Sequence, residues 1–160
     1  MSKQNRAMTG ERSAAAAALS PEENVIRFLQ ALEAQDHATV AALLGPDLRY
    51  TNVSLPTIKG GERVARFAKF ALRPGTAFGV QIHRIASKGD VVMTERTDLV
   101  RIGPVHIAFW VCGTFQVRRG RIVLWRDYFD WFAATRATLR GLAGVALPRL
   151  RTRLPTDIGC

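Results

Sequence analysis

The spacing of apolar positions changes about halfway along the chain. From residue 20 to about residue 72, apolar residues recur at the spacing of one face of an α-helix. From about residue 78 to residue 131, apolar and β-branched residues form continuous runs separated by short turn sequences. This change of period predicts helices in the first half of the chain and a sheet in the second.

Helices are predicted over residues 20–35, 37–45 and 60–72. The first begins with a capping box, because Ser20 is a good N-cap, Pro21 suits the first helical position and Glu23 lies three residues after the cap. Gly45 and Pro46 should end the second helix. Between the second and third helices, the segment "LRYTNV" is predicted to be a short extended stretch followed by a loop.

Strands are predicted over residues 78–86, 91–101, 105–117 and 121–131. The turn sequences "SKGD", "IGP" and "RRG" between them are so short that they can only join antiparallel neighbours. The strands should therefore form a meander, and a last helix is expected from about Trp131 to Leu142. Helices followed by such a sheet predict an α+β fold, in which the sheet curls over the helices to bury its inner face.

One domain over residues 20–143 is expected, with a disordered or loosely packed leader over 1–19 and a basic extension over 144–160. The net charge of +10 is partly terminal, because residues 1–20 hold three basic groups against one acid and residues 135–160 hold five against one. These termini lack interleaved aromatic residues, so no specific nucleic-acid binding is expected. The run from Ala14 to Leu19 is too short and too weakly apolar for a signal peptide or a transmembrane segment.

The cysteines and histidines give little sign of a metal site. Cys112 lies in an apolar run and Cys160 ends the sequence, which suits a reducing cytoplasm. The histidines, His37, His83 and His106, show no metal-binding spacing, and structural roles are expected for them. We therefore expect neither a metal nor a cofactor.

Charged residues occur at unexpected places in two predicted strands. Arg96 and Asp98 are two positions apart, so both point to the same side of the sheet. Asp127 shares a predicted face with Val123, Trp125 and Phe129. An acid on such a face needs either a partner or a function, and these residues alone leave both interpretations open.

The segment "YTN" adds two neutral polar groups, Tyr50 and Asn52, on one side of an extended stretch. With Arg96, Asp98 and Asp127, they provide two carboxyl groups, a cation between them and hydrogen-bonding groups that can hold a water molecule. An enzyme that adds water across a polarised bond needs such a set: a base, an acid and groups that orient the water.

The motifs "YTNVSLP", "TERTDLV" and "WRDYFD", in this order, resemble the limonene-1,2-epoxide hydrolase family over residues 20–132. The resemblance implies a cone-shaped α+β domain, related to ketosteroid isomerases and polyketide cyclases, whose helices pack in the concave face of a curved, mostly antiparallel sheet around a deep apolar pocket. It also implies a homodimer. The basic extension after Leu142 is longer and more cationic than the family pattern.

The resemblance implies a role for each polar residue. Asp127 is expected to be the general base for a water molecule held by Tyr50 and Asn52. Protonated Asp98 donates to the epoxide oxygen, and Arg96 bridges the two carboxyl groups without a covalent intermediate. Two acids close together in an apolar cavity would titrate as a coupled pair.

The expected substrate is a lipophilic epoxide, because the residues predicted to face the pocket are apolar. They are Leu29, Leu32, Val100, Phe109, Val111 and Phe129. A covalent epoxide hydrolase of the α/β-hydrolase type is excluded, since the chain has no nucleophile elbow. The alternatives are a ligand-binding protein or isomerase of the same fold, or a protein that binds anionic surfaces through its basic termini.

Overall fold

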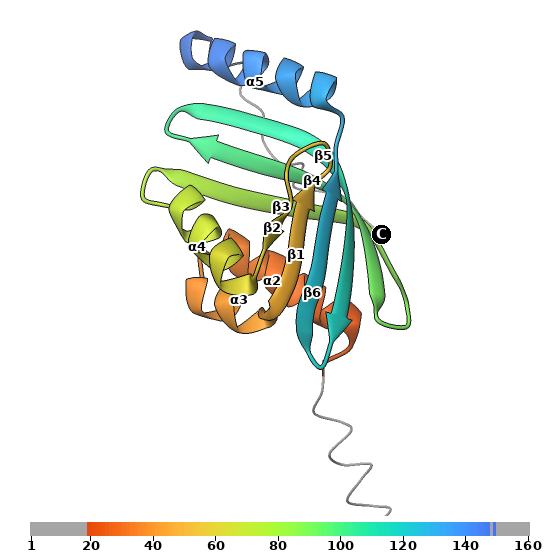
Figure 1. The fold of residues 1–160 in the computed structure, drawn as a ribbon. Coiled ribbons are helices and arrows are strands. Elements are labelled where there is room, and N and C mark those ends of the chain that lie inside the picture. The colour runs from red at the N-terminus through yellow and green to blue at the C-terminus, as the bar shows by residue number, and fades with distance from the viewer. Residues whose placement is uncertain (1–18, 148, 150–160) are drawn as a thin grey trace, which may run out of the picture.

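The computed structural model describes residues 19–147 and 149. Its helices are α2 (Pro21–Glu33), α3 (His37–Leu43), α4 (Gly61–Ala71) and α5 (Trp131–Ala146). Its strands are β1 (Leu44–Asn52), β2 (Ile58–Lys59), β3 (Thr76–Lys88), β4 (Val91–Ile102), β5 (Val105–Arg118) and β6 (Arg121–Tyr128) (Figure 1). The predicted leader, apart from Leu19, and most of the predicted basic extension lie outside the described residues.

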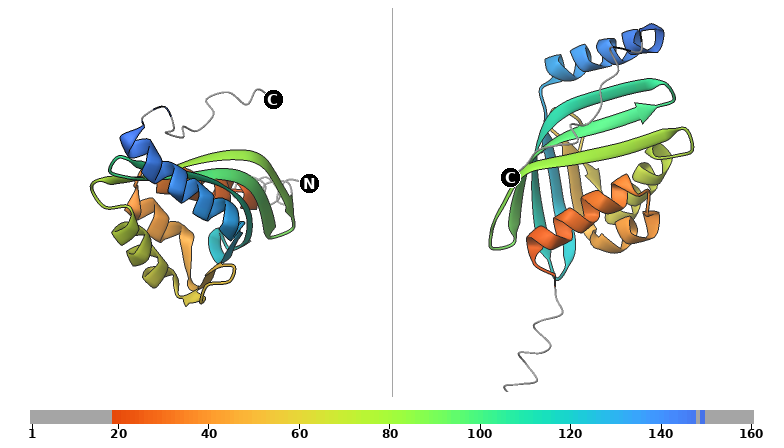
Figure 2. Two further views of the ribbon diagram at one scale, coloured as in Figure 1. Left: turned by 90° about the horizontal axis from the view of Figure 1, so that it is seen from above. Right: turned by 180° about the vertical axis from the view of Figure 1, so that it is seen from behind.

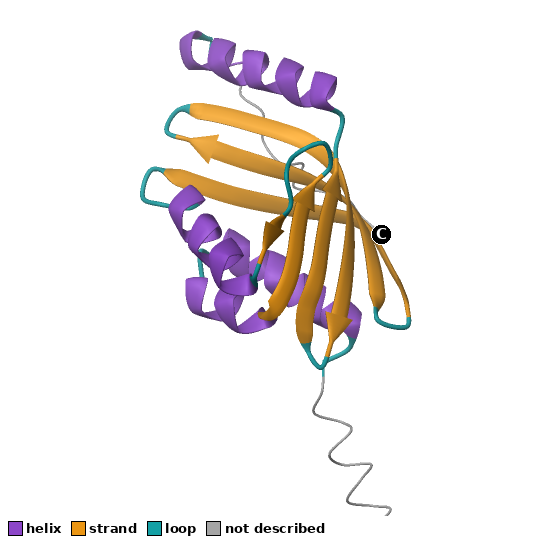
Figure 3. Cartoon of the chain, in the orientation of Figure 1, coloured by secondary structure: helices purple, strands orange, loops and turns teal. Residues whose placement is uncertain are grey.

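The six strands form one curved sheet in the order β2-β1-β6-β5-β4-β3. Strands β3 to β6 are the predicted antiparallel meander. Strand β1 pairs in parallel with β6 and antiparallel with β2. Since every pairing but that of β1 with β6 is antiparallel in the described sheet, the predicted mostly antiparallel α+β fold is confirmed. Helices α2, α3 and α4 lie in the concave face of the sheet, as the two views in Figure 2 and the colouring of Figure 3 show.

Several element boundaries differ from the prediction. Helix α3 ends at Leu43, and the residues predicted as its last turn, Leu44 and Gly45, already belong to β1. The prediction also missed β2, which is only two residues long. Strand β6 ends at Tyr128 because Asp130 caps α5, accepting a 2.8 Å hydrogen bond from the backbone N–H of Phe132.

The inner face of β6 also differs from the predicted alternation. The register between β5 and β6 shifts by one residue where Gln116 pairs with Leu124 and Val117 with Ile122. This bulge takes Val123 out of the alternation and points the fully buried Ile122 into the core instead. The prediction for Val123 was therefore wrong, whereas Trp125 and Asp127, which follow the bulge, are buried.

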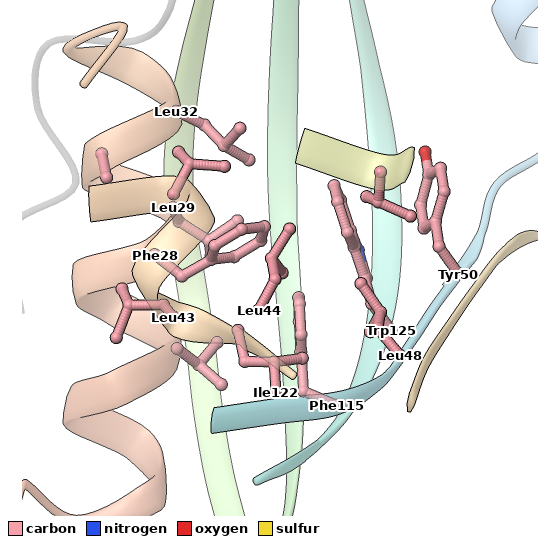
Figure 4. Packing of buried hydrophobic residues seen from close by; sticks show 14 of the residues in the cluster. Phe28, Leu29, Leu32, Leu43, Leu44, Leu48, Tyr50, Phe115, Ile122 and Trp125 are labelled. Atoms are coloured by element: carbon pink, nitrogen blue, oxygen red, sulfur yellow. The ribbon is translucent and has the colours of Figure 1, made fainter. Parts of the chain in front are cut away.

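The core lies between α2 and the concave face of the sheet. The capping box predicted for α2 is present, with Ser20 Oγ accepting from the N–H of Glu23 at 3.2 Å. Phe28 and Leu29 of α2 are fully buried, and the ring of Phe28 lies 5.0 Å from that of Trp125 (Figure 4). Burial of each such side chain contributes roughly 1.5–3 kcal/mol, which fixes α2 against the strands.

Helix α5 packs mainly against β5 and continues four residues beyond the predicted end at Leu142. Figure 1 shows it apart from the other helices, above the hairpin of β4 and β5. A side chain at Gly141 would begin only 2.5 Å from the carbonyl oxygen of His106, so glycine permits this close approach. No helix in the described part of the chain has the length and apolar character needed to cross a membrane.

Candidate active site

A cavity of about 240 Å³ lies between α4 and the concave face of the sheet. Its walls include apolar residues of α2, α4 and strands β3 to β5, together with Phe129 after β6. The polar side chains predicted from the sequence to act on a substrate, Tyr50, Asn52, Asp98 and Asp127, also line it. The cavity is thus an apolar chamber whose polar groups include two carboxyl groups.

The predicted apolar wall residues Leu32, Val100, Phe109, Val111 and Phe129 all line this cavity. Leu29 does not, because it is fully buried in the hydrophobic core one turn earlier on α2. The prediction missed the wall that α4 provides through Val64, Phe67, Ala68 and Ala71. The helical spacing of these residues predicted an apolar face on α4, but it could not predict which part of the protein that face would contact.

The centre of the site is a buried arginine between two aspartates. Arg96 of β4 has no exposed surface. Its Nε donates to Oδ1 of Asp98 at 2.8 Å, and its Nη2 donates to Oδ2 of the same carboxyl group at 3.2 Å. Nη2 also lies 2.8 Å from Oδ2 of Asp127 on β6. The pair that "TERTDLV" places on one face therefore points inward.

Two further side chains complete this network. Thr94 Oγ1 accepts a hydrogen bond from Nη1 of Arg96 at 3.1 Å. The indole N–H of Trp125 donates to Oδ2 of Asp127 at 2.9 Å. The alternation of strand residues already placed Trp125 on the face of Asp127 in the sequence, and the same alternation would have placed Thr94 on the face of Arg96.

Burial changes the acidity of both carboxyl groups. It raises the pKa of Asp98 to about 6, although the charge of Arg96 and its hydrogen bonds oppose the shift. Burial likewise raises the pKa of Asp127, against the charge of Arg96 and the hydrogen bonds from Arg96 and Trp125. Burial disfavours the charged guanidinium of Arg96, but the charges of the two carboxylates and their hydrogen bonds outweigh this effect and raise the pKa of Arg96. With one proton on the pair of acids, the three side chains are neutral together.

The parallel pairing of β1 with β6 brings the remaining predicted residues to the site. Asn52 pairs with Asp127 and Tyr50 with Trp125, and the rings of Tyr50 and Trp125 lie 4.1 Å apart. Burial and the nearby charge of Asp127 raise the pKa of Tyr50, while a hydrogen bond with Asn52 opposes this. The tyrosine hydroxyl is therefore neutral near pH 7 and can both donate and accept a hydrogen bond.

The arrangement suits proton transfer. Among residues 19–147 and 149, no three His, Cys, Asp or Glu side chains lie together as a metal site would require. Arg96 already supplies the positive charge between the two carboxyl groups. Two acids with raised pKa values beside an apolar chamber can give and take protons during a reaction.

Comparison with known proteins agrees with this geometry. The family model of the limonene-1,2-epoxide hydrolase catalytic domain matches residues 19–140, which is most of the chain. The chain belongs to the limonene-1,2-epoxide hydrolase family. This membership confirms the resemblance seen in the sequence, and the protein is an epoxide hydrolase of the limonene-1,2-epoxide hydrolase type.

The hydrolase is 47% identical over 127 residues to epoxide hydrolase EphG of Mycobacterium tuberculosis, a match that covers 79% of this chain and 85% of EphG. It also matches a solved LEH-like epoxide hydrolase of M. tuberculosis with a TM-score of 0.81 and 46% identity, over 84% of this chain and 95% of that one.

A more distant structure shares the fold alone. A protein with a ketosteroid isomerase-like fold from Catenulispora acidiphila gives a TM-score of 0.64 at 18% identity, over 72% of the hydrolase and 92% of that chain. The hydrolase therefore has the predicted cone-shaped fold.

Proposed function

We propose that the hydrolase adds water to a lipophilic epoxide in one step, giving a vicinal diol without a covalent intermediate. The observation that carries this proposal is the buried Asp127–Arg96–Asp98 network beside an apolar cavity. A protein that only binds a ligand has little reason to bury two acids on one arginine, since the desolvation cost is high.

Asp127 is the general base in this proposal. Its Oδ2 accepts from both Arg96 and Trp125, and these donors favour the ionised form. Its Oδ1 is buried and has no hydrogen-bond partner among the described residues, and the Asp127 side chain lines the cavity in which the attacking water would lie. Tyr50 and Asn52, beside Asp127 on β1, orient this water.

Asp98 is the general acid. As the water oxygen bonds to one epoxide carbon, a proton of that water passes to Asp127 and the bond from that carbon to the epoxide oxygen breaks. In the same step the epoxide oxygen takes the proton of Asp98. After the diol leaves, the pair of acids carries the same number of protons as before, and one proton must return from Asp127 to Asp98. The pKa of about 6 for Asp98 keeps this proton available much closer to neutral pH than for an ordinary aspartate.

The cavity supports a lipophilic substrate. Apart from the polar residues named above and Thr76, the side chains that line it are apolar or aromatic. The hydroxyl of Thr76 is engaged with the carbonyl oxygens of Ala71 and Arg73, at 2.8 and 2.7 Å. Binding to such walls would come mostly from burial of apolar substrate surface, with the catalytic groups fixing the position of the epoxide.

The proposal includes a homodimer. The outer face of the sheet carries three large apolar residues on neighbouring strands, Met93, Trp110 and Tyr128. Each of them is at least two-fifths exposed. This face of the sheet is the proposed interface between the two subunits. Sedimentation equilibrium would detect the dimer, and a charged residue in place of Trp110 should produce monomers. A reducing cytoplasm is the proposed location, and it suits the free thiol of Cys112.

The experiment that tests the function is a screen for diol formation with small terpene epoxides and bulky steroid epoxides. Turnover should depend on Asp127: Asp127→Asn should lower kcat by about 100- to 10,000-fold, because the base is lost. Asp47→Asn, an exposed position on β1, is the matched control and should keep full activity.

Full activity of Asp127→Asn would contradict the role of the base. If no epoxide is turned over while lipophilic ligands raise the melting temperature, the chain would instead be a binding protein or isomerase of the same fold.

A further inference from the structure

The central strand of the active site contains a glycine where the neighbouring inner positions carry large side chains. Gly113 lies on β5 between Val111 and Phe115, both of which are buried. It pairs with Thr94 on β4 and with Asp127 on β6. Gly113 therefore occupies the middle of a row of three inward-facing positions across the sheet.

The guanidinium group of Arg96 lies over this glycine. The backbone of Arg96 pairs with Val111, which is two residues before Gly113 and is the preceding inward-facing position on β5. Its side chain must cross β5 to reach Asp127 on β6, and the Nη2–Oδ2 distance of 2.8 Å shows that it does. The ring of Phe115, the next inward residue on β5, lies 5.8 Å from the guanidinium carbon.

Any side chain at Gly113 would occupy the space that the guanidinium uses. A methyl group built there overlaps Nη1 of Arg96 and lies 2.7 Å from Oγ1 of Thr94 and 3.0 Å from Oδ1 of Asp127. The partners of the arginine leave it little freedom to yield, since Nε and Nη2 are bonded to Asp98 and Nη1 to Thr94.

We propose that Gly113 is a positioning residue of the active site, whose missing side chain lets Arg96 cross β5 and bridge the two catalytic acids. The kinetic consequences of this positioning role rest on the proposed function. The role lies in space rather than in backbone conformation, because the φ angle of Gly113 is outside the left-handed region. Serine or alanine at this position would fit the strand but displace the arginine.

The kinetic test compares Gly113→Ala with Gly45→Ala. Gly45 is also a strand glycine, and a methyl group there would lie 3.1 Å from Cγ1 of Val123 and 3.2 Å from the carbonyl oxygen of Ile122, away from Arg96. Gly113→Ala should lower kcat by about 100-fold, as expected for misplaced catalytic groups, with little change in KM because the apolar walls are intact. Gly45→Ala should lower only the melting temperature.

The pH profile separates positioning from a general loss of stability. The titratable groups around the guanidinium are Asp98 on β4, Asp127 on β6 and Tyr50 on β1, and the charge of Arg96 lowers the pKa of all three. Displacing Arg96 should therefore shift the whole profile of kcat against pH to higher pH. An unchanged kcat, or a reduced kcat with the wild-type pH profile, would overturn the proposal.

A stability cycle tests the geometry without any substrate. Gly113→Ala should lower the melting temperature strongly in the wild-type background and much less in an Arg96→Ala background, where no guanidinium is present to be displaced. If Gly113→Ala alone does not fold, recovery of folding in the double variant supports the proposal. An equal loss in both backgrounds, or loss of folding in both, would overturn it. The result of this cycle does not depend on whether the chain turns over any epoxide, because only melting temperatures are compared.

Discussion

Asp127 lies 2.8 Å from Arg96 although the strands that carry them, β6 and β4, are separated by β5. The arginine reaches over the inner surface of the intervening strand and holds Asp98 on its own strand as well. Two acids that would repel each other in an apolar cavity are thus kept together by one cation. The proposed proton transfers depend on this bridge.

The dependence of kcat/KM on pH should reflect the raised pKa of Asp98. The general acid must carry its proton, so activity should fall as the pH rises through the pKa of about 6 and should show an alkaline limb there. An unperturbed aspartate would place this limb about two units lower. Rate measurements from pH 4 to pH 9 would reveal it. A limb below pH 4.5 would contradict the assignment of Asp98 as the acid.

Replacement of Asp98 should stabilise the protein near neutral pH. Because the folded-state pKa of Asp98 lies above its unfolded value, the folded state binds more protons, and stability falls as the pH rises from about 4 to 6. Asp98→Asn removes this cost and leaves the pair of Arg96 and Asp127. The free energy of unfolding at pH 7 should rise by about 1 to 3 kcal/mol while activity is lost.

Urea unfolding of wild type and Asp98→Asn would test this effect. The gap between the two proteins should narrow as the pH falls from 6 toward 4, because the wild-type carboxyl group then takes up its proton in the folded state. A variant less stable than wild type at pH 7 would show that the Asp98–Arg96 contact outweighs the cost of burial.

A larger side chain at Val100 should discriminate between substrates by size. Val100 lines the cavity of about 240 Å³, whereas its neighbour Leu99 does not. Val100→Phe should lower kcat/KM for bulky epoxides by about tenfold or more and affect small terpene epoxides less. Leu99→Phe is the matched control. Equal losses for all substrates would indicate that Val100 does not limit the space available to them.

Local patterns in the sequence predicted most of the fold. Capping residues such as Ser20 and short turns between strands act over a few residues, so helices and the antiparallel meander could be read directly. The parallel pairing of β1 with β6 could not, because Asn52 and Asp127 are far apart in the chain. The bulge at Val123 also gave no signal, since one extra residue changes the alternation without changing composition.

The site was predictable only in part, because its contacts also join residues that are far apart in the chain. The alternation of Arg96 with Asp98 showed that the two residues share a face but not which face it was. The further polar residues Asp127, Tyr50 and Asn52 favoured the inward direction, and the structure places the pair inward. Gly113 was missed because the absence of a side chain carries no chemical signal in a sequence. Its importance appears only when the path of the arginine is known.

Direct hydration is the central claim, and single-turnover hydrolysis in ¹⁸O-labelled water tests it most directly. With the enzyme in excess over an epoxide substrate, the proposed one-step reaction predicts that the label appears in the diol during the first turnover and that Asp98 and Asp127 stay unlabelled. A covalent ester would instead give the first diol an oxygen from the protein. Unlabelled diol together with ¹⁸O in either aspartate would contradict the account.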